Sequence, residues 1–177
     1  MNKEKIKKYQ IFSVIFTFIL GTLLHFTYNL SNQNQIVAVF SSVNESTWEH
    51  LKLIFFPTLL TIIIGYFYFN KSVSNFVCSK TLGLLVSICF TIVFFYTYTG
   101  IIGKNIAFID VASFFISVLI GEFISYVLII NNIKCKNWVA IIILLILTIL
   151  FIVFTFNPPK IGLFKDPATN TYGIKKF

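Results

Sequence analysis

A stretch of twelve residues, SSVNESTWEHLK at positions 41–52, gathers side chains that could do chemistry in a chain otherwise rich in apolar residues. It contains two carboxylates, Glu45 and Glu49, together with His50 and Lys52. The glutamates are four residues apart, so on a helix they would share one face and repel each other. The positive end of a helix dipole, the lysine, a bound cation or one shared proton would compensate that repulsion. The pattern predicts either a strongly capped helix start or a site for acid–base or metal chemistry.

The same stretch carries the signals for the start of a helix. Residues 42–45 (S-V-N-E) and 46–49 (S-T-W-E) both match the capping box, in which a Ser oxygen and a Glu carboxylate bind free amides of the first turn. On this interpretation Trp48 lies in the aromatic belt at the membrane boundary, and Lys52 extends toward the head groups. One capping box needs one glutamate, so the second carboxylate leaves the functional interpretation open.

His25 lies near the end of the first apolar stretch and is the second histidine of the chain. If the first two helices form an antiparallel hairpin, His25 comes level with Glu45, Glu49 and His50. Two histidines and two carboxylates suit zinc or another divalent ion, although the spacing differs from H-E-x-x-H and requires donors from two helices. The alternative is a plain hydrogen bond from His25 to a neighbouring helix.

Three further acids are candidates. Asp110 lies one turn inside the fourth apolar stretch and Asp166 lies in the C-terminal tail, so either could face the same pocket. Glu122 is different, because a rise of 1.5 Å per residue puts it about 12 Å from the opposite end of its helix. An acid at that depth predicts a function such as a step on a transport path. The alternative is a carboxyl that is protonated, or that snorkels toward the membrane boundary, and is bonded to Tyr126 or Ser125.

Membrane helices must position these residues. Of the 177 residues, 57% are hydrophobic and 11% charged, whereas soluble proteins have about 25% charged residues. A helix of about 20 mostly apolar residues spans a bilayer. Five stretches are long enough: 9–30, 46–70, 81–99, 107–130 and 138–156. The predicted fold is all-α, an integral membrane bundle of five transmembrane helices within residues 1–156, followed by a short folded tail at 157–177.

Small and polar residues recur every four positions in three of these stretches, which is typical of helix faces turned toward other helices. The rows are Ser13, Thr17, Gly21, His25 and Asn29; Ser79, Gly83, Ser87, Thr91 and Thr99; and Ser113, Ser117, Gly121 and Ser125. The last stretch offers Thr148 and Thr155 and otherwise only apolar side chains. We therefore expect it at the lipid-facing edge of the bundle.

The lysines predict the orientation. All 14 basic residues are lysines, and one side of the predicted spans carries Lys3, Lys5, Lys7, Lys8, Lys71, Lys80, Lys134 and Lys136. The short loops opposite carry only Lys104, so the positive-inside rule predicts a cytoplasmic N-terminus and an extracytoplasmic C-terminus. The tail lysines, Lys160, Lys165, Lys175 and Lys176, count against this orientation. On this prediction residues 41–52, the loop around Lys104 and the tail all face outward.

Composition narrows the class of protein. The net charge of +8 does not indicate nucleic-acid binding, because the lysines lie at the ends of spans rather than on one soluble face. Abundant Lys, Asn, Ile and Phe indicate AT-rich codons, and hence a low-GC bacterium and its plasma membrane. Cys78, Cys89 and Cys135 are odd in number and lack C-x-x-C spacing, so we expect small buried apolar residues rather than a disulfide or a zinc site.

Two motifs carry a resemblance. S-x-V-N-E-S-x-W-E-H-x-K at 41–52 and P-P-x-x-x-L-F-x-D-P-x-T-x-x-Y-G at 158–173, together with the histidine near the end of the first span, resemble an uncharacterised family of small multi-pass membrane proteins from Gram-positive bacteria, a domain of unknown function. The resemblance implies a shared outward face but no activity. Its motif positions are His25, Asn44, Glu45, Ser46, Trp48, Glu49, His50, Lys52, Asp166 and Tyr172.

Three functions fit these residues. The first is a membrane-embedded hydrolase or transferase acting on lipid-linked substrates, although the nucleophile motif G-x-S-x-G does not occur. Its catalytic groups would be Glu45, Glu49, His50, His25 and Lys52, and its substrate-lining groups Asn44, Ser46, Trp48, Asp110, Asp166 and Tyr172. The second is a component that binds or transports a small solute or cation, with Glu122 on the path and a homo-oligomer completing it. The third is a scaffold that docks a membrane protein through Trp48.

Overall fold

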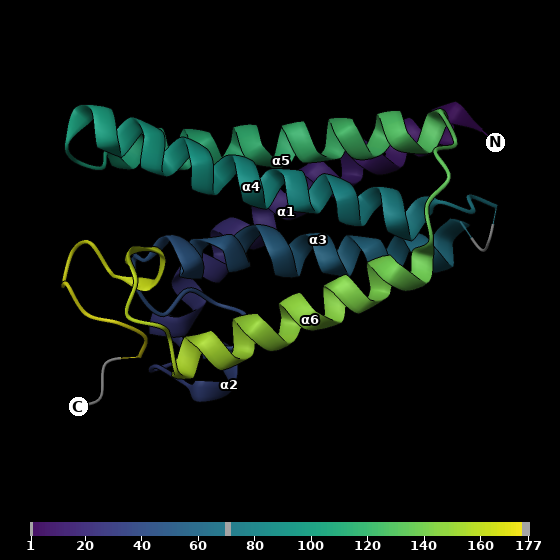
Figure 1. The fold of residues 1–177 in the computed structure, drawn as a ribbon. Coiled ribbons are helices and arrows are strands. Elements are labelled where there is room, and N and C mark those ends of the chain that lie inside the picture. The colour runs from purple at the N-terminus through teal and green to yellow at the C-terminus, as the bar shows by residue number, and fades with distance from the viewer. Residues whose placement is uncertain (1, 70–71, 175–177) are drawn as a thin grey trace.

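The computed structural model describes residues 2–69 and 72–174, and within them the chain is a bundle of α-helices without strands (Figure 1). The helices are α1 (Lys3–Leu30), α2 (Gln35–Ala38), α3 (Thr47–Phe69), α4 (Phe76–Ile102), α5 (Ala107–Ile130) and α6 (Asn137–Phe156), followed by the 3₁₀ turn η1 (Gly162–Phe164). All except α2 are long and apolar enough to cross a membrane. The predictions of an all-helical fold and of five such helices are confirmed. Predicted boundaries at residues 70 and 177, and Lys71, Lys175 and Lys176, lie outside the described residues.

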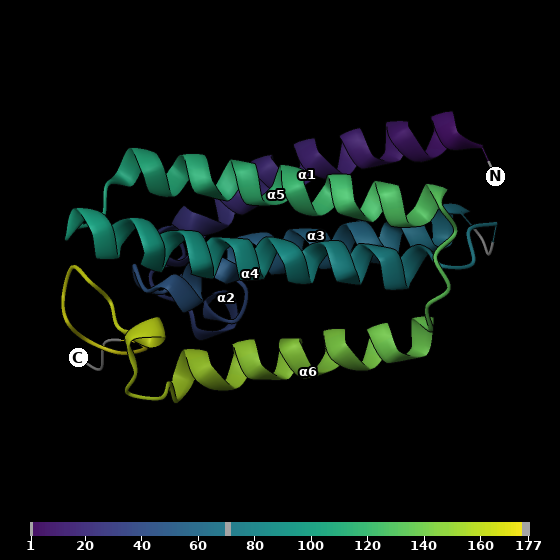
Figure 2. The ribbon, with the colours of Figure 1, turned by 45° about the horizontal axis from the view of Figure 1, so that its top comes forward.

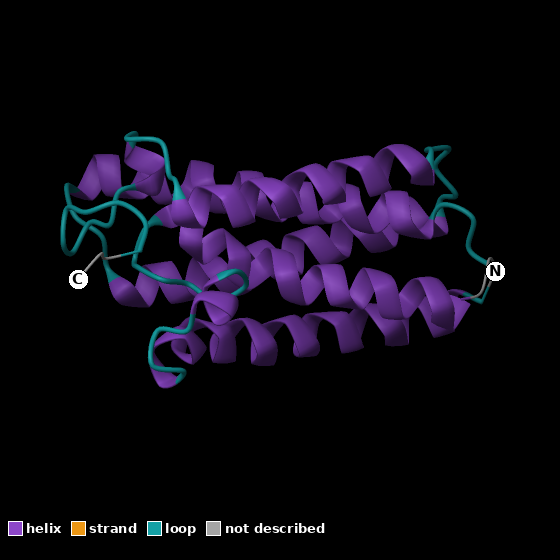
Figure 3. Cartoon of the chain, turned by 90° about the horizontal axis from the view of Figure 1, so that it is seen from below, coloured by secondary structure: helices purple, strands orange, loops and turns teal. Residues whose placement is uncertain are grey.

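The long helices run back and forth along one axis, so the loops gather at two ends of the bundle (Figure 3). One end holds the start of α1 and the loops 72–75 and 131–136. The other end holds the 31–46 segment with α2, the 103–106 loop and the tail, as Figure 1 shows. The segments expected to share one face of the molecule therefore do share one end.

The rows of small residues form the helix contacts, as predicted. All members of the row on α5 are buried, and so are Ser79, Gly83, Ser87 and Thr91 on α4. A Cβ atom added to Gly83 would lie only 2.3 Å from the carbonyl oxygen of Gly121, so α4 and α5 pack with their backbones in contact. On α1 the row is buried from Ser13 to Gly21, but Asn29 at the far end is exposed.

Helix α6 runs along the edge of the bundle (Figure 2). Only Ala140, Leu144, Phe151 and Thr155 of this helix are buried, and its other side chains are partly or fully exposed. This is the edge position expected from its apolar sequence.

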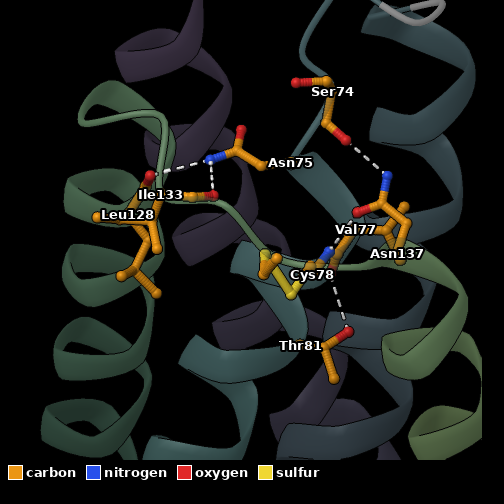
Figure 4. The surroundings of a disulfide bond; sticks show 9 residues. Ser74, Asn75, Val77, Cys78, Thr81, Leu128, Ile133 and Asn137 are labelled. Carbon is orange, nitrogen blue, oxygen red and sulfur yellow. Dashed lines mark hydrogen bonds between the residues drawn. A yellow bond between two sulfur atoms is a disulfide. The ribbon is translucent and has the colours of Figure 1, made fainter.

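The cysteine prediction is wrong. Cys78 at the start of α4 and Cys135 in the α5–α6 loop form a disulfide, and Cys89 is exposed rather than buried (Figure 4). Asparagines align the segments around this bond: Asn75 Nδ2 donates to Leu128 O at 3.0 Å, and the backbone amide of Cys78 donates to Asn137 Oδ1 at 3.0 Å. The sequence separation of 57 positions hid the pairing, because the packing of α4 and α5 brings the two cysteines together.

Candidate metal and cavity site

Three of the predicted site residues converge where α1 meets the start of α3. His25 comes from the end of α1, Glu45 from the loop before α3, and His50 from the first turn of α3. The two imidazole Nε2 atoms are 3.2 Å apart. Glu45 Oε2 lies 3.7 Å from His25 Nε2 and 3.4 Å from His50 Nε2. We call this group the His–Glu–His cluster.

Serines and an asparagine hold the loop that carries Glu45. Ser41 Oγ accepts a hydrogen bond from the backbone amide of Tyr28 at 3.0 Å and donates to Leu24 O, which fixes the loop against the last turns of α1. Asn44 Oδ1 accepts from the amide of Ser46 at 2.9 Å. The loop is therefore anchored on both sides of Glu45, which orders a carboxylate that lies outside any helix.

Hydrogen bonds also set the protonation of the cluster. His50 Nδ1 lies 3.0 Å from the carbonyl oxygen of Ser46, which can only accept, so Nδ1 carries a proton and Nε2 is the nitrogen turned toward Glu45 and His25. The neighbouring imidazoles of His25 and then His50 hold the pKa of Glu45 well below its usual range. Glu45 is thus ionised at neutral pH and turned toward two imidazole nitrogens. His25 Nδ1 is buried and finds no hydrogen-bond partner among the residues that the structure describes.

The cluster has the size of a metal site. Zinc bonds of 2.0–2.1 Å at tetrahedral angles place neighbouring ligand atoms about 3.3–3.4 Å apart. The three separations in the cluster are 3.2, 3.4 and 3.7 Å. Two histidines and one glutamate form a ligand set that catalytic zinc sites use, with the fourth position left for water or substrate. The side chain of Glu45 is 53% exposed, so the cluster can be reached from outside the protein.

A cavity of about 380 Å³ opens beside the cluster between α1, α3, α4 and α5. Its polar lining includes the cluster and Asp110, whose carboxylate accepts a hydrogen bond from the Tyr98 hydroxyl. The apolar lining comprises Phe26, Leu53, Ile54, Phe95, Ala107, Val111, Phe114 and Phe115. The site therefore combines ionisable groups with an apolar chamber.

Glu49 and Lys52 lie apart from this cavity and bind each other. Lys52 Nζ is 2.5 Å from Glu49 Oε2, and the side chains are 0% and 2% exposed. The ammonium also donates to Ala38 O at 2.8 Å and to Thr155 Oγ1 at 3.0 Å. Lys52 does not extend toward the head groups as expected, because the pair joins α3 to α2 and α6 inside the protein.

The capping interpretation of 41–52 is half right. Ser46 Oγ accepts from the backbone amide of Glu49 at 3.4 Å, as a capping box requires. Glu49 does not return the bond to Ser46, because its Oε2 accepts from the amide of Val43 at 3.1 Å instead. Ser42 forms no box with Glu45, since its hydroxyl donates to His25 O at 3.4 Å.

Trp48 lies inside the protein rather than in a boundary belt. Its ring is 4.6 Å from that of Phe151 on α6 and 4.8 Å from that of Phe164 in η1. This packing leaves the ring 9% exposed, so Trp48 joins α6 and the tail to α3 and does not present an anchor for a partner.

The tail residues are organised around turns. Asp166 is buried and accepts from the amide of Ala168 at 2.8 Å and the hydroxyl of Thr169 at 2.7 Å. Tyr172 packs against the apolar core and pairs with Lys165 in an isolated bridge. Asn44 Nδ2 donates to Gly173 O at 3.0 Å, which ties the tail to the loop that carries Glu45. None of these three lines the cavity.

A family model described as a family of unknown function (DUF6512) matches residues 1–174. The chain belongs to DUF6512. No curated protein and no solved structure matches it. The expected membership of a family of unknown function is confirmed, and the family transfers no activity to the site.

A second polar cluster in this DUF6512 chain involves two residues that sequence reasoning missed. Lys80 was expected in a loop, but α4 begins at Phe76, so Lys80 is buried inside the helix. Its Nζ lies 2.5 and 2.6 Å from the carboxylate oxygens of Glu122 and 3.3 Å from Gln10 Oε1. Gln10 Nε2 in turn donates to Ser125 Oγ at 3.0 Å. The polar side chain of Gln10 within an apolar stretch is the sequence feature that could have indicated this cluster.

Proposed function

We propose that the protein is a membrane-embedded metal-dependent hydrolase or transferase in which His25, Glu45 and His50 hold a divalent ion such as zinc. The observation that supports it best is the convergence of two imidazole nitrogens and a carboxylate oxygen at tetrahedral spacing beside a cavity. Such an ion would polarise a carbonyl or phosphoryl oxygen, or lower the pKa of a bound water.

The chain's own groups would complete the chemistry. Asp110 lines the cavity from α5, opposite the cluster on α1 and α3, and its carboxylate is suited to accept a proton as a general base. The Tyr98 hydroxyl orients that carboxylate by hydrogen bonding. Ser46 O fixes the ring of His50, as the outer partners of metal ligands do. Glu49 and Lys52 take a structural role in this proposal, because each satisfies the other.

Metal analysis tests the proposal. Purified protein should bind about one zinc per chain by mass spectrometry and titration calorimetry, and Glu45→Gln, His25→Ala and His50→Ala should each weaken binding by more than the roughly 10–100-fold cost of losing an outer partner. Glu4→Gln is the matched control, because Glu4 is an exposed glutamate that pairs with Lys8 far from the site. Unchanged zinc affinity in the three ligand variants would overturn the proposal.

We infer that the site faces outward in the plasma membrane of a low-GC bacterium, with a cytoplasmic N-terminus. The described lysines support this, since Lys3, Lys5, Lys7, Lys8, Lys134 and Lys136 lie at the opposite end of the bundle. The Cys78–Cys135 disulfide lies at the same end as these lysines and counts against this orientation, because disulfides are rare in the cytosol. In a background without the natural cysteines, Asn105→Cys should react with an impermeant maleimide on intact cells, whereas Lys134→Cys should react only after permeabilisation. The reverse pattern would invert the orientation.

A further inference from the structure

We propose that the cavity beside the His–Glu–His cluster binds one acyl chain of a phospholipid, which enters between α1 and α5 and places its phosphate at the cluster. The role given to the phosphate rests on the proposed function, whereas the binding of the acyl chain is argued from the cavity alone. Together they name phospholipids as the substrate class of the site proposed above.

The lining changes in character along the cavity. His25, Glu45, His50 and Asp110 are the ionisable groups, and all four lie near the end of the bundle that holds the 103–106 loop. Deeper along the helices the lining is supplied by side chains such as Leu53 of α3 and Phe114 of α5. A polar mouth over an apolar chamber matches an amphiphile with a head group and a chain. A volume of about 380 Å³ also lies within the range of ligand pockets.

The rim of the cavity faces the side of the bundle. Phe26 of α1 is 55% exposed and Val111 of α5 is 56% exposed, yet both line the cavity. Exposed apolar side chains on membrane-spanning helices face lipid. The opening between these two helices is therefore reached from the bilayer, where the available apolar occupant is an acyl chain.

An aromatic contact between α1 and α5 adjoins the cavity. The rings of Phe18 and Phe115 lie 4.6 Å apart in an edge-on contact, and Phe115 lines the cavity while Phe18 does not. Gly21 allows close packing beside the cavity, because a Cβ atom there would lie 2.8 Å from the ring of Phe114 and 2.5 Å from Leu53 O. Lys80 and Glu122 do not line the cavity, so it is separate from that ion pair.

A phosphate is the head group that best fits the mouth. The open position of a His₂Glu-bound divalent ion takes an oxygen ligand, and a phosphoryl oxygen is a typical one. Lys104 precedes Asn105, which lines the cavity, so the same loop offers a cation to an anionic group.

Photo-crosslinking tests the inference. The whole protein would be reconstituted with zinc in phosphatidylglycerol vesicles that contain a phospholipid with a diazirine on its acyl chain, and the labelled peptides would be mapped by mass spectrometry. We expect labels on α1, α3 and α5 at cavity residues such as Leu53 and Phe114. Thr91→Phe, which fills the cavity from α4, should reduce these labels about tenfold, as overpacking of a binding site does.

Two further variants keep the test decisive. Val111→Trp obstructs the rim at an exposed position where folding tolerates a large side chain, and it should reduce the same labels. Thr97→Phe is the control, because Thr97 is an exposed threonine of α4 that does not line the cavity. Labels confined to the outer surface, or cavity labels unchanged in both Thr91→Phe and Val111→Trp, would overturn the inference.

The same samples separate the two proposals. Zinc binding with no cavity label would overturn the lipid inference and leave the metal site standing. A cavity label without zinc binding would support the acyl-chain site and overturn the metal proposal. Competition by soluble glycerol phosphate as strong as that by phospholipid would show that the head group alone is recognised, which also overturns the acyl-chain site.

Discussion

At one end of the bundle His25, Glu45 and His50 meet beside a cavity, whereas at the other end Lys80, Glu122 and Gln10 meet where α1, α4 and α5 pack together. In the second group every charge has a partner: the ammonium binds a carboxylate and an amide oxygen, and both side chains of the ion pair are at most 7% exposed. In the first group Glu45 is half exposed, and within residues 2–69 and 72–174 the Nδ1 atom of His25 has no hydrogen-bond partner. Charges that satisfy one another hold helices together, and groups with unused bonding capacity are the ones available to a ligand.

Breaking the group of Lys80, Glu122 and Gln10 should have the largest effect on stability. Glu122→Gln leaves the Lys80 ammonium buried without its counter-ion, and we expect a loss of about 3–5 kcal/mol in the free energy of unfolding. Denaturation in detergent micelles measures it. The double variant Lys80→Met with Glu122→Leu should recover most of the loss, because it removes both charges. A Glu122→Gln protein as stable as the wild type would instead point to a Glu122 that is free for transport.

The Glu49–Lys52 pair should behave in the same way, although it lies close to the candidate site. Glu49→Gln should destabilise the protein by about 3 kcal/mol through the unpaired Lys52. Thr155→Val should cost about 2 kcal/mol, because it removes the hydroxyl that bonds Lys52, Glu49 and the carbonyl oxygen of Phe151. Trp48 fluorescence should report the release of α6, because Trp48 packs on Phe151 of that helix. If Glu49→Gln folded normally and lost only activity, Glu49 would belong to the catalytic group.

At the His–Glu–His cluster, zinc should change the stability of the protein more than a single substitution does. Zinc at 100 times its Kd should stabilise the wild type by about 2.7 kcal/mol, seen as a rise in Tm. His50→Gln should change the Tm of metal-free protein little and should abolish the rise with zinc. A zinc-dependent rise that persists in His50→Gln would assign the ion to another site.

The smallest effect concerns pH. The pKa of Glu45 is lowered in the folded protein, so its ionised form contributes stability above the unfolded carboxyl pKa of about 4.3, and this contribution is lost as pH falls through the folded pKa. The Tm difference between wild type and Glu45→Gln in metal-free protein should therefore shrink as the pH is lowered below about 4. A difference that stayed constant down to pH 2 would show that the histidines do not bind Glu45.

Much of this arrangement could be predicted from local patterns. The length of apolar stretches gave the five long helices, and the four-residue rows gave their buried faces, because both depend on periodicity within one helix. The meeting of His25 with Glu45 and His50 follows from the expected hairpin of α1 and α3. What the patterns could not supply were pairings between distant segments. Lys80 with Glu122 and Cys78 with Cys135 depend on the register of α4 against α5 and the loop that follows.

Trp48 is another residue whose surroundings local patterns could not predict. An aromatic residue at the start of a membrane helix is typical of the boundary belt. Here α6 and η1 cover it, because Phe151 and Phe164 pack on its ring. A tryptophan covered by the tail and a tryptophan at the membrane boundary have the same local sequence pattern. They differ only in whether the tail packs over the end of the bundle, which no local pattern predicts.

The hydrogen bond between Asn44 and Gly173 makes the candidate site sensitive to what happens far along the chain. Asn44 immediately precedes Glu45, so a protease nick or an antibody that displaced the segment around residue 173 would remove a support from the residue beside that carboxylate. Such a cut would leave His25, Glu45 and His50 in the protein but loosen the geometry on which the proposed metal binding depends.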